Sequence, residues 1–82
     1  MDKAERLQQE AEAVLNRMRQ RHNKEWDEIL LESQQALENA TTVKQIKATS
    51  KEYERKFKDL RKKQKEETIQ LQEKFIDQLL SL

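Results

Sequence analysis

The segment ENATTVKQIKATS, residues 38–50, decides whether this chain forms one long helix or a helical hairpin. On either side of it the sequence is charged and helix-forming. The segment contains three consecutive β-branched residues, Thr41, Thr42 and Val43, which lose side-chain freedom in a helix. Asn39 precedes them and tolerates the left-handed conformation in which many helices end. These features favour a break.

Two capping sites would allow a new helix to begin after such a break. Gln45 follows Thr42 by three residues, and Glu52 follows Thr49 by three, which is the spacing of a capping box. Against a break, the chain has no glycine and no proline, and a tight turn between helices usually contains one of them. Thr and Val each cost only about half a kcal/mol in a helix. The balance leans slightly toward a continuous helix, and a break or hinge within residues 39–50 stays open as the alternative.

Composition points to a helical chain without a large core of its own. The chain has 82 residues, of which 40% are charged and 34% hydrophobic. This length predicts one module spanning residues 1–82, too polar to build a compact core alone. Its apolar residues recur at helical spacing, which argues against disorder. The overall charge is +1, but residues 1–40 carry six basic and nine acidic groups while residues 41–82 carry eleven and seven. Halves of opposite sign favour antiparallel contact.

Apolar residues form a stripe along the expected helix. Near the N-terminus they recur every three and four residues, as in a heptad seam. Farther along, the steps become three, four and four, an eleven-residue spacing that straightens or reverses the usual left-handed supercoil. Folding the stripe about residue 41 pairs Trp26 with Phe57 and His22 with Leu60. The predicted association seam consists of Leu7, Leu15, Trp26, Ile29, Tyr53, Phe57, Leu60, Leu71, Phe75 and Leu79.

The stripe is wider than two helices need. A two-helix seam buries two positions in seven, whereas bundles of three or four helices bury about three. Leu30, Leu31, Ile76 and Leu80 lie beside the seam, and a lone hairpin would leave them partly in water. The sequence therefore predicts an all-α fold. We expect a long amphipathic helix or an antiparallel helical hairpin that assembles with like or unlike chains, as a coiled coil or a bundle of three or four helices.

No group of residues suggests catalysis. The chain has one histidine, His22, and neither cysteine nor glycine, so it lacks a zinc-ligand pattern and a phosphate-binding loop. We expect a non-enzymatic protein that needs no cofactor and no metal. No apolar run approaches the roughly 20 residues of a transmembrane helix, and the N-terminus lacks the apolar core of a signal peptide. A soluble intracellular protein is expected, with cytoplasm and nucleus both open.

The function expected from these patterns is structural oligomerisation or scaffolding through helix association. No motif singles out a family. The alternative rests on two basic clusters, RMRQRHNK at 17–24 and RKFKDLRKKQK at 55–65, which an antiparallel fold brings together. Such a basic girdle suits nucleic acid bound through its backbone, an anionic surface or an acidic protein. The candidate residues for polyanion binding are Arg17, Arg19, Arg21, Lys24, Arg61, Lys62, Lys63 and Lys65.

Overall fold

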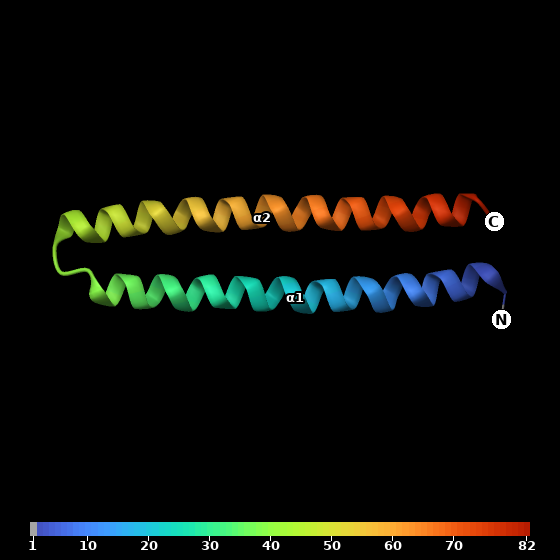
Figure 1. Ribbon diagram of the computed structural model, residues 1–82, viewed down its shortest axis with the longest axis horizontal. Helices are drawn as coiled ribbons and strands as arrows, with labels where there is room; N and C mark the ends of the chain where they lie inside the picture. Colours follow the sequence, from blue (N-terminus) through green and yellow to red (C-terminus); the bar gives the residue numbers. More distant parts are fainter. Residues whose placement is uncertain (1) are drawn as a thin grey trace.

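The computed structural model describes residues 2–82 as an antiparallel hairpin of two long helices (Figure 1). Helix α1 runs from Lys3 to Asn39 and helix α2 from Val43 to Leu80. The Cα atoms extend over 62 × 17 × 7 Å, so the molecule is a single layer of two helices. The all-α prediction is confirmed in its hairpin form, and the slight preference for a continuous helix is wrong.

Capping side chains make the turn between the helices. Thr42 has an extended backbone, with φ −121° and ψ 156°, and its hydroxyl accepts a hydrogen bond from the Gln45 backbone N–H at 3.1 Å. The Gln45 side chain reaches back and accepts from the backbone N–H groups of Thr41 and Thr42, at 2.8 and 3.3 Å. The capping box predicted at Thr42 is therefore confirmed. The alternative start at Thr49 is wrong, because Thr49 lies inside α2.

Helix α1 ends without a left-handed residue. Ala40 follows the helix with φ −78° and ψ 123°, and no residue from 2 to 82 has a positive φ. Asn39 is the last residue of α1, and the helix ends without using its tolerance for the left-handed conformation. An extended backbone is open to any residue, and β-branched residues such as Thr41 and Thr42 suit it well. This is why the chain turns without glycine.

The shielded side chains repeat every eleven residues in both helices. They step by four, three and four along nearly the whole length, which extends the spacing found in part of the sequence. Eleven residues over three turns nearly match the natural period of an α-helix, so neither helix needs to wind around the other. Figure 1 shows the helices lying side by side with little supercoil. The buried or half-buried positions are Leu7, Ala11, Val14, Leu15, Met18, His22, Glu25, Trp26, Ile29, Ser33, Ala36 and Ala40 in the first half, and Thr49, Tyr53, Lys56, Phe57, Leu60, Gln64, Glu67, Thr68, Leu71 and Phe75 in the second.

Polar contacts between the helices establish their register. The Gln64 side-chain amide donates to the backbone carbonyl of His22 at 3.0 Å, and the ring centroids of Trp26 and Phe57 lie 4.8 Å apart. The predicted pairing of Trp26 with Phe57 is confirmed. His22, one turn before Trp26, accepts this hydrogen bond through its backbone carbonyl, and its ring lies 3.4 Å from Glu67.

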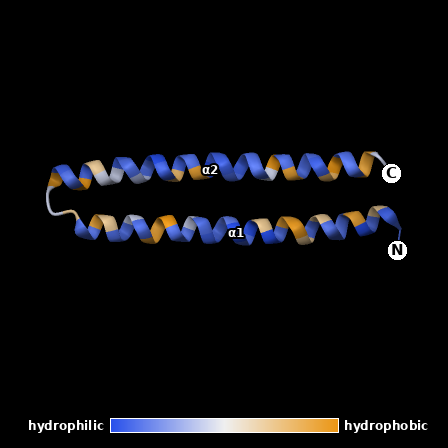
Figure 2. Ribbon diagram, in the orientation of Figure 1, coloured by the Kyte–Doolittle hydropathy of each residue, from blue (hydrophilic) through white to orange (hydrophobic). Residues whose placement is uncertain are grey.

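The core of the hairpin is thin. Only Tyr53, Leu60 and Phe75 are buried apolar residues, and no large side chain among residues 2–82 is completely withdrawn from solvent. Apolar residues are spread along both helices and do not gather in one place (Figure 2). The buried polar residue is Ser33, whose hydroxyl donates to the carbonyl of Leu30 at 2.8 Å. A single layer of two helices therefore shields the side chains of the seam from solvent and leaves most other apolar side chains exposed.

Candidate association interface

The predicted seam lies between the two helices of one chain. Nine of its ten residues are buried or half-buried there, and Leu79 is the exception at 37% exposed. Trp26 and Phe57 pack at its middle with their ring planes inclined by 47°. Because the seam is already filled from within the chain, contact with another chain needs a surface outside it.

Apolar side chains remain exposed beside the seam. Leu30, Leu31, Ile76 and Leu80 have 42%, 56%, 53% and 81% of their surface exposed. The prediction that a lone hairpin leaves these four partly in water is therefore confirmed. Further large apolar side chains share this exposure: Leu37, Val43, Ile46, Ile69, Leu79 and Leu82.

Ion pairs between the helices occupy one face of the hairpin. Arg21 of α1 binds the carboxylate of Glu67 in α2, and Lys56 of α2 lies 3.4 Å from Glu32 in α1. Glu32 follows Arg21 by eleven residues and Lys56 precedes Glu67 by eleven. Eleven residues are about three whole turns, so both pairs lie on the same side of the seam. We call this side the ion-pair face.

Trp26 faces the other way. It follows Arg21 by five residues, which turns it about 140° around α1, across the seam from the ion pairs. The Arg61 guanidinium lies 5.6 Å from the centroid of the Trp26 ring. Trp26, Phe57 and Arg61 line a hollow of about 490 Å³ together with Glu54 and Lys58. We call the side that bears this hollow the tryptophan face.

Most of the exposed apolar side chains belong to the tryptophan face. Leu30 lies one turn after Trp26 and Leu37 lies three turns after it, so both lie on its side of α1. Leu31 is turned about 100° farther than Leu30, onto the outer surface of α1. In α2 the exposed apolar residues lie eleven or twenty-two residues from Glu54, Phe57 or Lys58, which line the hollow. They are Val43, Ile46, Ile69, Ile76, Leu79 and Leu80, of which Ile69 and Leu80 share the position of Lys58 at the outer margin of the face.

The carboxylates of the ion-pair face are engaged within the chain. A hydrogen bond from Arg21 is the main cause that lowers the pKa of Glu67 below its ordinary value of 4.5. A hydrogen bond from the Tyr53 hydroxyl at 2.9 Å is the main cause that lowers the pKa of Glu32, with help from Lys56. Burial and the bond to Glu32 raise the pKa of Tyr53. This face thus joins α1 to α2.

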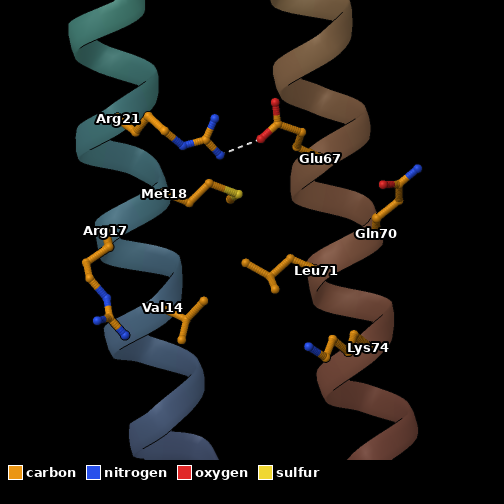
Figure 3. Close-up of a pocket in the computed structure, with 8 residues that line it drawn as sticks. All are labelled: Val14, Arg17, Met18, Arg21, Glu67, Gln70, Leu71 and Lys74. Atoms are coloured by element: carbon orange, nitrogen blue, oxygen red, sulfur yellow. Dashed lines mark hydrogen bonds and ion pairs between the residues drawn. The ribbon is translucent and has the colours of Figure 1, made fainter.

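A second hollow, of about 580 Å³, opens on the ion-pair face (Figure 3). Met18 and Leu71 point toward one another from the two helices, and the Arg21–Glu67 pair lies at one end. The hollow is an open continuation of the seam. Its lining is Val14, Arg17, Met18, Arg21, Glu67, Gln70, Leu71 and Lys74.

The candidate polyanion-binding residues do not share a face. Because Gln64 is level with His22, the clusters at 17–24 and 55–65 overlap along the rod, as the girdle requires. Around the rod they are dispersed: Arg21 lies on the ion-pair face and Arg61 on the tryptophan face, where each already has a partner. Lys62 and Lys63 are each turned by about a further 100°.

Over residues 2–82, neither helix combines the length and apolar character needed to cross a membrane. In the same range, no three histidine, aspartate or glutamate side chains gather where they would hold a metal ion. Comparisons with protein-family models, curated proteins and solved structures found no match to this chain.

Proposed function

We propose that the hairpin is a non-enzymatic association module, which buries its exposed apolar side chains against helices of further chains and so completes a bundle. The observation that carries this proposal is the exposure of Leu30, Ile76 and Leu80 along a molecule one layer thick. Helical domains reach stability by packing at least two layers around a shared core. Exposed apolar patches of this kind usually mark interaction surfaces.

The number of helices in the bundle follows from the width of the apolar stripe. Two helices cover each other along a narrow seam, whereas helices in a four-helix bundle bury about three positions in seven. With two helices from each chain, two chains supply four. In such a bundle the association is the function, and the module acts by holding together whatever is attached to it.

Binding of a polyanion is the alternative function, and it has less support. Its basic residues are spread around the rod, and Arg21 and Arg61 already contact Glu67 and Trp26. Affinity for a phosphate backbone falls steeply with salt, whereas apolar association does not. A salt titration with a DNA or RNA oligonucleotide therefore separates the two.

The test of the proposed function is the mass of the purified chain in solution. Light scattering on a sizing column, over a range of loading concentrations, should give a multiple of the 9.9 kDa chain mass. Circular dichroism of the same samples should stay helical. A chain that remains at 9.9 kDa up to about millimolar concentration, where only very weak association would escape detection, contradicts the proposal.

A further inference from the structure

We infer that the partner is a second copy of this chain and that the two copies meet through their tryptophan faces. This inference rests on the proposed function and assigns its surface and its partner. The two faces of the hairpin differ in chemistry: one carries the exposed leucines and isoleucines, and the other carries the ion pairs between the helices. A flat hairpin that adds one more layer must use one of these faces.

The tryptophan face has the residue types that dominate protein interfaces. Trp and Arg are the most enriched residues among those that carry binding energy. Phe57 and Arg61, one turn apart on α2, both contact Trp26, so its ring is ordered before a partner arrives. A side chain that is already ordered loses less entropy on binding. Leu30 lies one turn away and widens this centre.

The charges of the tryptophan face suit a copy of itself. Arg19, Arg61, Lys65, Glu12 and Glu54 lie on this face by their position around the helices. Lys47 and Lys58 of α2, and Glu5, Asp27 and Glu38 of α1, lie at its margins toward the outer surfaces, where Asp27 shares a hollow with Leu31. Five basic and five acidic groups cancel, so a second copy meets no net repulsion. A strongly acidic or basic partner, by contrast, gains nothing from a neutral face.

The ion-pair face is the poorer candidate. Docking there would draw the Arg21–Glu67 and Lys56–Glu32 pairs out of water, and desolvation of ion pairs is costly. The two helices, of 37 and 38 residues, are nearly equal in length. Two hairpins stacked by their tryptophan faces therefore form a four-helix bundle along most of their length, related by a two-fold axis.

Two neighbouring leucines give the matched test. Leu30 is on the tryptophan face and Leu31 on the outer surface of α1, and both are exposed, at 42% and 56%. We expect Leu30→Glu to weaken dimerisation by about tenfold or more, as for a central interface residue, and Leu31→Glu by about twofold or less. Sedimentation equilibrium of each variant gives the dissociation constants. Equal effects of the two changes, or a larger effect at Leu31, would overturn the inference.

The single tryptophan gives a second readout that needs no mutation. If the tryptophan faces meet, the emission of Trp26 should shift to shorter wavelength, and its quenching by iodide should fall, as the wild-type chain dimerises. A wild-type chain that stays monomeric sinks the proposed function itself. A wild-type dimer whose Trp26 emission does not change as it forms sinks only the choice of face. The purified chain is the sole protein present, so any assembly that forms consists of its copies.

Discussion

Gln45 does more for the turn than its place on an exposed surface suggests. Its side-chain carbonyl accepts from the Thr41 backbone N–H, the Thr41 hydroxyl and the Thr42 backbone N–H, at 2.8, 3.0 and 3.3 Å. Gln45→Ala removes all three bonds, and we expect it to lower the free energy of unfolding by about 1 kcal/mol, as the loss of a helix cap does. Urea unfolding followed by circular dichroism measures this.

The control for this residue is Gln45→Glu. A carboxylate still accepts the three hydrogen bonds, and a negative charge in the first turn of a helix is favourable. The unfolding free energy of Gln45→Glu should therefore stay at the wild-type level or rise slightly. If alanine is tolerated as well as glutamate, the side chain of Gln45 does not stabilise the turn.

Glu67 and Glu32 make the stability of the hairpin depend on pH. Their pKa values are lowered in the folded chain, first by hydrogen bonds from Arg21 and Tyr53 respectively. A lowered pKa means that the folded state holds the proton less tightly than the unfolded state does. The stabilisation is therefore complete above the ordinary carboxyl pKa of 4.5 and is lost as pH falls through the lowered values.

We expect the urea midpoint to fall between about pH 5 and about pH 2, the range in which paired carboxylates take up protons. The variant Glu67→Gln has no carboxylate at this position to take up a proton, so its urea midpoint should fall less over the same pH range. Unfolding curves at several pH values test both statements. A variant whose acid response equals that of the wild type would show that the Arg21–Glu67 pair does not contribute.

At the scale of the helices, the caps at Thr42 and Gln45 are what separates the turn from a continuous helix locally. The chain has no glycine or proline, so nothing in residues 40–42 forbids a helix. Replacing Thr41, Thr42 and Gln45 together by alanine removes the caps and inserts the best helix former. We expect this variant to favour one continuous helix, about 120 Å long at 1.5 Å per residue.

Small-angle scattering measures this change of shape. The hairpin has a Cα radius of gyration of 18.8 Å, and the variant should exceed it clearly. Thr68→Ala is the control, because Thr68 lies inside α2 and its hydroxyl donates to the Gln64 carbonyl of the same helix. A compact triple variant would mean that packing along the seam, and not the caps, keeps the chain folded back.

The same segment explains what the sequence could and could not reveal. Periodicity identified the seam, because burial follows helical spacing in α1 and α2 alike. The choice between rod and hairpin depended on a few hydrogen bonds of the Gln45 side chain. Each of them contributes little net free energy, and they compete with the backbone hydrogen bonds that a continuous helix would form in the same residues. The hydrogen bond from the Gln64 amide to the His22 carbonyl is likewise a contact that an apolar pattern does not describe.

The candidate interface was only half visible in the sequence. Leu30, Leu31, Ile76 and Leu80 stood out because they exceed what a two-helix seam buries. Their separation into a tryptophan face and an outer surface required the register, which the contacts between Trp26, Phe57 and Arg61 supply. For the whole molecule, therefore, the width of the apolar stripe predicts that an interface exists. The way the chain turns back on itself determines on which face of the hairpin that interface lies.

A hairpin this thin should depend on its partner for stability. Its few buried apolar residues contribute a small core, so much of the apolar burial would come from association. Any partner that binds only the folded state raises apparent stability with concentration. We therefore expect the midpoint of thermal unfolding to rise between about 5 µM and about 500 µM chain, a hundredfold range that changes the mass-action term appreciably. Circular dichroism melts of wild type and Leu30→Glu at both concentrations test this, because the variant should lose the rise.

Raising the salt from about 50 mM to about 500 mM should leave the rise nearly unchanged, since a neutral apolar interface is little affected by screening. A midpoint independent of concentration would mean that the single layer of helices is stable by itself.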